Sequence, residues 1–110
     1  MAAENHTVKF ELFKQFKLDE KDLKNLCLKM GVRSLAVFGS VISGDFKIGQ
    51  SDIDFLVEFE TVSADRYFDF LDGLKELFKY DKVDLVTVPS LKNQVIRQAI
   101  LSSQENIYAA

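Results

Sequence analysis

Residues 52–59 carry the clearest structural pattern in this sequence. Apolar side chains occupy every second position of the segment, which is the period of a β-strand with one buried face. The apolar positions are Ile53, Phe55, Val57 and Phe59, and the residues between them are Asp52, Asp54, Leu56 and Glu58. A strand with so apolar a face is stable only when helices or a second sheet cover it. The chain must therefore build a sheet and the layer that covers it.

Helix and strand patterns follow one another along the rest of the chain. We expect a helix over residues 18–30, strands over 33–38 and 82–88, and a loop or short helix over 41–51. Residues 8–17 fit a strand or a helix. This order predicts an α/β or α+β domain in which helices cover a small sheet.

Two more helices are expected in the second half of the chain. Ser63 is placed to cap the first of them, and Pro89-Ser90 is expected to open the last. Each would bury one side against the sheet. The apolar side of the first carries Tyr67, Phe68, Leu71, Leu74 and Phe78, and that of the last carries Leu91, Val95, Ile96 and Ile100.

Length and charge exclude several classes of protein. A chain of 110 residues is the size of one domain. With 14 basic and 17 acidic residues the net charge is −3, so direct binding to nucleic acid, which needs clustered cations, is not expected. No apolar stretch approaches the roughly 20 residues that span a bilayer, and the first residues lack the apolar run of a signal peptide. We therefore expect a cytoplasmic protein with no membrane segment.

The chain has one cysteine and one histidine, which restricts the kinds of metal site it can form. A single cysteine, Cys27, excludes an internal disulfide and a cysteine-rich zinc site. It lies in the apolar stripe of the helix at 18–30, so we interpret it as a core residue. The histidine, His6, lies near the start of the chain. Any metal is therefore expected to be held by carboxylates.

Gly39-Ser40 directly follows the strand at 33–38. A glycine at that place lets the backbone approach a ligand closely. A serine that opens a short helix offers a hydroxyl and free backbone N–H groups, which suit a phosphate. The pair by itself is also typical of an ordinary turn.

Asp52 and Asp54 lie two residues apart on an otherwise apolar strand. Residues with that spacing point to the same face and lie about 7 Å apart at Cα. Two like charges on one face repel unless a cation lies between them, and hard oxygen ligands suit Mg²⁺. An exposed strand face with ordinary acids is the alternative, although aspartate is depleted in strands.

Asp84 lies in the third apolar strand, Lys82 to Val88. A carboxylate among apolar residues needs a partner or a metal. If the second and third strands are neighbours, Asp84 completes a site of three carboxylates, as a metal ligand or as a base for an attacking hydroxyl. A salt bridge to Lys82 or Lys92 is the competing interpretation.

Together these motifs resemble a known signature. Phe38-Gly39-Ser40, a spacer of eleven residues, and Asp52-Ile53-Asp54 are similar to the DNA polymerase β-type nucleotidyltransferase superfamily. The short chain and Val83-Asp84-Leu85-Val86 resemble its minimal nucleotidyltransferase branch. The resemblance covers residues 20–108. It implies a mixed sheet flanked by helices, with residues 1–17 as an N-terminal extension and 18–110 as the nucleotidyltransferase domain.

The resemblance also implies an activity and a partner. In the family, ATP with two Mg²⁺ ions donates AMP to a hydroxyl group. By resemblance, Gly39 and Ser40 bind the donor triphosphate, and Asp52, Asp54 and Asp84 are the catalytic, metal-binding carboxylates. Many minimal members are antitoxins that transfer AMP to a tyrosine of a HEPN-domain ribonuclease toxin. We accordingly expect this chain to be a protein adenylyltransferase that acts on such a partner.

The sequence departs from the family after Gly39-Ser40. Many members carry a basic residue before the next glycine, whereas Val41 to Gly44 contains none, so Lys47 is the nearest candidate for nucleotide binding. A cation at the phosphates stabilises the charge that moves in the transfer. The alternative function is a binding module that neutralises the toxin by occlusion, with some of the ten phenylalanines on its contact face. Assembly into a homo-oligomer stays open.

Overall fold

Strand β2 (Ile53–Phe59) lies inside a four-stranded sheet, as its alternating sequence predicts. The computed structural model describes residues 7–110, and His6 lies outside that range. The strands lie in the order β3 (Val83–Thr87), β2, β1 (Val32–Phe38) and β4 (Glu105–Ala109). Because β1 is antiparallel to β2 and β4 while β3 is parallel to β2, the sheet is mixed, which confirms the expected fold class.

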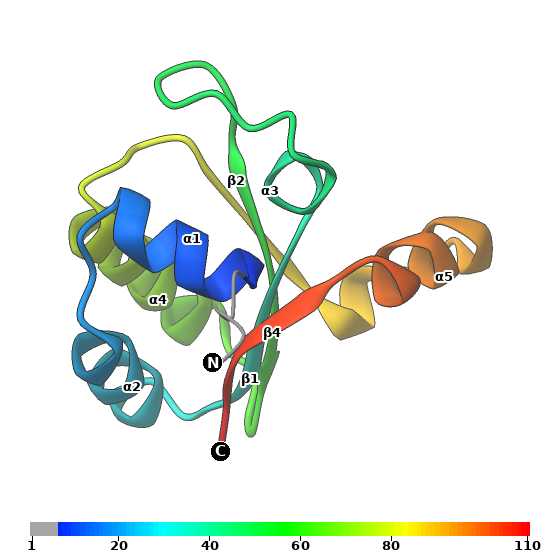
Figure 1. The fold of residues 1–110 in the computed structure, drawn as a ribbon. Helices are drawn as coiled ribbons and strands as arrows, with labels where there is room; N and C mark the ends of the chain where they lie inside the picture. Colours follow the sequence, from blue (N-terminus) through cyan, green and yellow to red (C-terminus); the bar gives the residue numbers. More distant parts are fainter. Residues whose placement is uncertain (1–6) are drawn as a thin grey trace, which may run out of the picture.

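Three helices cover one face of the sheet (Figure 1). They are α1 (Val8–Gln15), α2 (Glu20–Lys29) and α4 (Ala64–Phe78). Between them and the sheet lies the core, in which Phe55, Phe70 and Leu74 are fully buried. Cys27 is also fully buried, and burial raises the pKa of its thiol to about 12, which confirms that it is a core residue. The crossover from β2 through α4 makes β3 parallel to β2.

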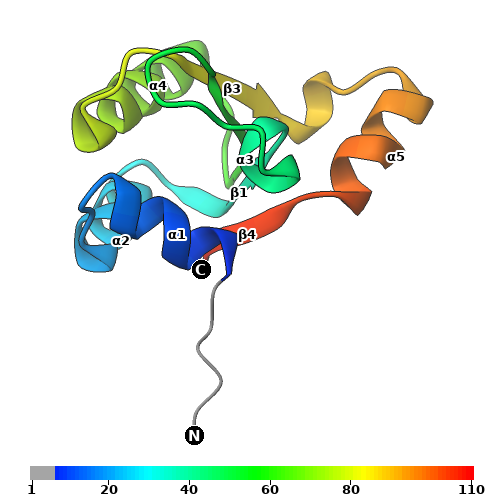
Figure 2. The same cartoon turned by 45° about the horizontal axis from the view of Figure 1, so that its top comes forward.

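The other face of the sheet is covered less. Helix α5 (Gln94–Ser102) projects on that side, away from α1, α2 and α4 (Figures 1 and 2). The short helix α3 (Ser40–Ser43) follows β1 directly, and the 3₁₀ helix η1 (Val88–Ser90) follows β3. No helix in residues 7–110 combines the length and the apolar character needed to cross a membrane.

Polar side chains define where several helices begin. The Ser63 side chain accepts a hydrogen bond from the Arg66 amide at 3.1 Å, which confirms the predicted cap of α4. Residues 8–15, whose pattern was ambiguous, are the helix α1. Its first amides, on Val8 and Lys9, donate to the Glu105 carboxylate at the start of β4. A carboxylate at a helix N-terminus is favourable, so this contact ties α1 to the sheet.

Leu12 of α1 is buried in the same core as the rest of the chain. Helix α1 falls within the segment 1–17 that the sequence suggests is an extension. Residues 1–6 lie outside the described part, and the boundary between extension and domain stays a prediction.

Four expectations for the second half of the chain are corrected. Helix α5 does not open at Pro89-Ser90. It begins at Gln94, where the Asn93 side chain accepts hydrogen bonds from the amides of Val95 and Ile96. The strand β4 has no counterpart among the expected elements, because only Ile107 of its five residues is buried. Phe68, which was expected on the core side of α4, is 60% exposed. The expected buried side of the last helix is also wrong, since Val95 and Ile96 are 79% and 54% exposed and Leu91 lies before α5.

Candidate active site

Asp54 and Asp84 meet at the start of two parallel strands. Asp54 is the second residue of β2 and is paired with Asp84 of β3 and with Phe38 of β1. Asp52 directly precedes the first residue of β2. The structure thus brings Asp54 and Asp84 side by side, as expected, and places Asp52 at the entrance of the same strand.

Gly39 lies against the Asp54 side chain. Its φ of +73° and ψ of −139° belong to a region that essentially only glycine adopts. A Cβ placed on Gly39 would overlap Oδ2 of Asp54 and would lie 3.1 Å from its Cγ. The glycine predicted to bind phosphate and the carboxylate predicted to bind metal are therefore direct neighbours.

Ser40 connects the same turn to Asp52. It is the first residue of α3, and its Oγ donates to the backbone carbonyl of Asp52 at 3.5 Å. Lys47 lies in the exposed loop that follows α3, and its amide donates to Oγ of Ser51 at 2.9 Å. Within residues 7–110 its side chain makes no hydrogen bond or ion pair, so its predicted role in nucleotide binding stays a prediction.

The carboxyl group of Asp54 is harder to ionise than an ordinary one. Burial is the main cause, followed by the negative charges of Asp84 and Asp52 and by a side-chain hydrogen bond with Asp84. Together these raise its pKa from 3.8 to about 6. Within the described range, no lysine or arginine forms an ion pair with these three aspartates, so the alternative pairing of Asp84 with Lys82 or Lys92 is not observed.

Uncompensated carboxylates at one place are the condition under which a divalent cation is attracted. The donors here are all oxygens, the kind that Mg²⁺ prefers. No three carboxylate, imidazole or thiol groups in residues 7–110 stand close enough to form a ready-made metal site. Asp54 and Asp84 are paired, whereas Asp52 is exposed and lies outside the strand. The residues fit Mg²⁺ by their chemistry, and the complete three-aspartate site stays a prediction.

Two tyrosines lie beside the site, and the sequence assigned neither of them a role in it. The Tyr80 hydroxyl donates to the carbonyl of Ser51 at 2.5 Å and accepts from the Gly49 amide at 2.9 Å. The Tyr67 hydroxyl donates to the Leu85 carbonyl at 2.5 Å. Burial and the charge of Asp84 raise the pKa of Tyr67. No local pattern marks these tyrosines, because their hydrogen-bond partners are distant in the sequence.

The raised pKa of Asp54 predicts how the stability of the metal-free protein varies with pH. The folded state holds the proton more tightly than the unfolded state, so the contribution is present below about pH 4 and is lost as the pH rises through about 6. We expect the melting temperature of the wild type, relative to Asp54→Asn, to rise as the pH is lowered from 7 to 5. Thermal unfolding in the presence of a chelator measures this, and parallel pH curves for the two proteins would contradict it.

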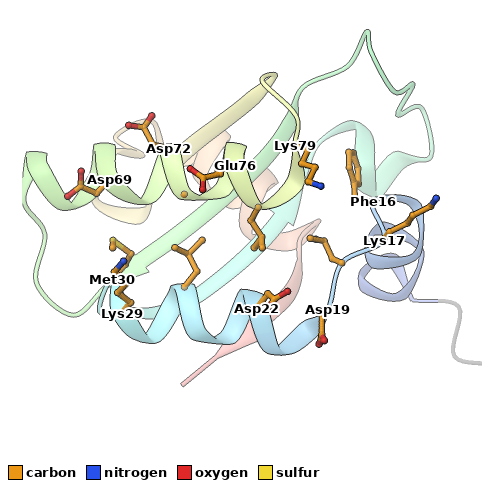
Figure 3. A pocket seen from close by; sticks show the side chains of 14 residues that line it. Phe16, Lys17, Asp19, Asp22, Lys29, Met30, Asp69, Asp72, Glu76 and Lys79 are labelled. Carbon is orange, nitrogen blue, oxygen red and sulfur yellow. The ribbon is translucent and has the colours of Figure 1, made fainter.

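A groove of about 930 Å³ lies between α2 and α4 (Figure 3). Acidic and basic side chains line its rim, including Asp69, Asp72, Glu76 and Lys29. None of Gly39, Ser40 or the three aspartates lines this groove. We therefore place the active site where β1 ends and where β2 and β3 begin.

Residues 20–105 match the family described as nucleotidyltransferase domain. A Methanocaldococcus jannaschii protein named as a protein adenylyltransferase is 41% identical over 81 residues, which is 73% of this chain and 81% of that protein. Protein adenylyltransferase MntA of Thermococcus cleftensis is 36% identical over 77 residues, which is 70% of this chain and 77% of that protein.

Solved structures share the fold. One described as a minimal nucleotidyltransferase superposes with a TM-score of 0.68 at 26% identity, covering 93% of this chain and 98% of the other. A tri-AMPylated Shewanella oneidensis HEPN toxin in complex with an MNT antitoxin gives a TM-score of 0.58 at 19% identity, covering 86% of this chain and 73% of that one. At that level of identity the second similarity concerns the fold alone.

Proposed function

The chain belongs to the nucleotidyltransferase domain family, and on that premise we propose that it transfers AMP from ATP to a hydroxyl group of a partner protein. The observation that carries the proposal is the contact of Gly39 with Asp54, next to Asp84. This arrangement puts the backbone turn at the start of α3 directly beside a pair of carboxylates. A nucleoside triphosphate needs both, since the turn accommodates phosphate and the carboxylates favour its metal.

The proposal assigns roles to the residues of the turn and to the three aspartates. Gly39 lets the turn lie directly against the Asp54 carboxylate, and Ser40 presents the first backbone donors of α3 to the triphosphate. Asp52, Asp54 and Asp84 would hold Mg²⁺, two ions by the family resemblance, which supplies positive charge to the triphosphate. Lys47, from the exposed loop after α3, is the candidate for an added cation there.

The bond changes follow from that placement. The partner's hydroxyl oxygen forms a bond to the α-phosphorus of ATP, the bond from that phosphorus to the bridging oxygen breaks, and pyrophosphate leaves. Asp84 is exposed, whereas Asp54 is half-buried, so Asp84 is the better placed to accept the hydroxyl proton. Because Asp54 and Asp84 are adjacent, the proton acceptor lies beside the phosphate site.

The class of partner comes from the names of the relatives. The similar proteins are named as protein adenylyltransferases, and a structural neighbour is an MNT antitoxin bound to an AMPylated HEPN toxin. We propose that this chain is the antitoxin of a HEPN-domain ribonuclease and that the acceptor is a tyrosine of that toxin. Since ATP is the donor, the reaction would take place in the cytoplasm.

The test is to incubate the chain with Mg²⁺, with ATP labelled on the α-phosphate and with a HEPN-domain protein as the acceptor. We expect label on the partner and a mass gain of one AMP unit or a multiple, located on a tyrosine by fragmentation. A chelator is expected to stop the labelling. If the partner gains no mass while wild-type chain and magnesium are present, the proposed activity is wrong.

The second candidate is a binding module that blocks the toxin without modifying it. It is favoured by the absence of a cation in residues 41–44 and by exposed apolar side chains, with Phe68 60% and Val95 79% exposed. Most of the other phenylalanines pack in or against the core, so a contact face rich in phenylalanine is reduced to a few positions. Rescue of growth by Asp52→Ala and Asp54→Ala, with no AMP on the toxin, would favour this candidate.

A further inference from the structure

We propose that Tyr80 is a positioning residue, which holds the loop in front of Asp52 and thereby sets how tightly the site binds divalent metal. This inference rests on the function proposed above. Tyr80 touches no predicted metal ligand, and it acts through the backbone that leads into Asp52.

The loop between α3 and β2 needs an anchor. Its residues 44, 45 and 47–50 are exposed. Two glycines with positive φ, Gly44 and Gly49, interrupt it, and a Cβ at either would meet no atom within 4 Å. Of residues 44–50 only Phe46 packs against the core, so the position of Asp52 depends on whatever fixes the loop's last residues.

The Tyr80 hydroxyl supplies that anchor. It donates to the Ser51 carbonyl at 2.5 Å and accepts from the Gly49 amide at 2.9 Å. Among the described residues, these are the only hydrogen bonds that join residues 46–51 to another part of the chain. The other hydrogen bonds of this segment close turns within the loop. The ring is fixed in turn by an edge contact with Phe16, at 5.4 Å between centroids, and by a tilted contact with Phe46 of the same loop, at 6.0 Å.

The Ser51 carbonyl belongs to the peptide group that also contains the Asp52 amide. Because that group is planar, a hydrogen bond to its oxygen fixes the orientation of the bond that enters Asp52. Sheet pairing begins only at the next residue, where the Ile53 amide donates to the Lys82 carbonyl at 2.8 Å. The Ser40 hydroxyl reaches the Asp52 carbonyl at 3.5 Å, which is a long hydrogen bond. Tyr80 therefore restrains Asp52 on the side that the sheet does not hold.

Tyr80 also lies four residues before Asp84, in the segment that leads into β3. The same side chain thus joins the approaches to both strands that carry the paired aspartates. Pairing between β2 and β3 already fixes Asp54 and Asp84, and the Tyr80 hydroxyl connects the backbone before Asp52 to that pair of strands. Without the Tyr80 hydroxyl, the position of Asp52 is expected to vary relative to Asp54 and Asp84.

The test is Tyr80→Phe, which removes the hydroxyl and keeps the ring packing. We expect the melting temperature to stay near that of the wild type. Mn²⁺ binding, followed by electron paramagnetic resonance, is expected to weaken about tenfold, as when a residue supporting a metal ligand is lost. The Gly49 amide, measured by hydrogen exchange, is expected to exchange faster. AMP transfer is expected to need more metal for half its maximal rate, with the KM for the partner unchanged.

Tyr108→Phe is the matched control, since Tyr108 is a half-buried tyrosine of β4, away from the loop. It is expected to match the wild type in Mn²⁺ affinity, Gly49 exchange and rate. The inference is overturned if Tyr80→Phe binds Mn²⁺ and protects Gly49 as the wild type does. If the wild type transfers no AMP, the proposed function fails. The Mn²⁺ and exchange measurements then still decide the role of Tyr80.

Discussion

Asp54→Asn is expected to lower AMP transfer by roughly 10³-fold or more, the scale of losing a main charge-stabilising group. Asp54 is central to the site because it touches Gly39 on one side and is paired with Asp84 on the other. An asparagine of the same shape fills the space and keeps the fold, but it offers no negative charge to a metal. The loss is therefore expected in the rate of transfer and in metal affinity, not in the amount of folded protein.

The same substitution is expected to stabilise the metal-free protein at neutral pH. Asp54 is half-buried beside two like charges, and its burial together with those charges raises its pKa to about 6. A neutral side chain removes the cost of holding a third negative charge there, so the melting temperature without metal should be equal to or higher than that of the wild type. Gain of stability with loss of activity is typical of a residue kept for function.

Glu58→Gln is the matched control for Asp54→Asn. Glu58 lies on the same strand and the same face, four residues further along, and is also half-buried. It loses a charge in the same way, yet it is distant from Gly39 and Asp84. We expect its transfer rate to remain near that of the wild type. Equal losses in both variants would mean that general charge on this face, and not Asp54, determines the rate.

Period and spacing allowed the central part of the fold to be predicted. The alternation at residues 53–59 gave β2 its correct buried face, because a half-buried strand leaves a simple two-residue period. Asp84 was predicted to join the site if the second and third strands are neighbours, and the parallel pairing of β2 with β3 meets that condition. Gly39 and Ser40 were predicted from their place after a strand, although nothing local indicated that Gly39 touches Asp54.

The parts that failed depend on contacts between distant residues. The predicted apolar side of α4 includes Phe68 and omits Phe70, yet Phe70 is fully buried and Phe68 is exposed, because the sheet determines which side of the helix is covered. Strand β4 has one buried residue and is stabilised by pairing with β1, which no local period reveals. Tyr80 shows the same limit in the site, since its hydroxyl meets Gly49 and Ser51 only once the chain has folded.

Gly39→Ala is expected to damage both folding and transfer. An alanine at φ +73° and ψ −139° is strained by about 1–3 kcal/mol, and its Cβ would overlap the Asp54 carboxylate. The turn between β1 and α3 must then shift, or Asp54 must leave its place beside Asp84. Either change displaces a group of the active site, and a displacement of about 1 Å lowers the rate of transfer by roughly 10²-fold. Urea unfolding and the rate of partner labelling measure the two effects separately.

Gly44→Ala separates the backbone cost from the collision. Gly44 also has a positive φ, +86°, but a Cβ there would meet no atom within 4 Å. We expect it to lose about 1 kcal/mol of unfolding free energy, as a left-handed alanine does, and to keep most of its transfer rate. If only Gly39→Ala loses activity, the collision of its Cβ with Asp54 is the cause of that loss. If both variants lose stability and activity in proportion, Gly39 acts through the backbone alone, and its contact with the carboxylate has no part in the reaction.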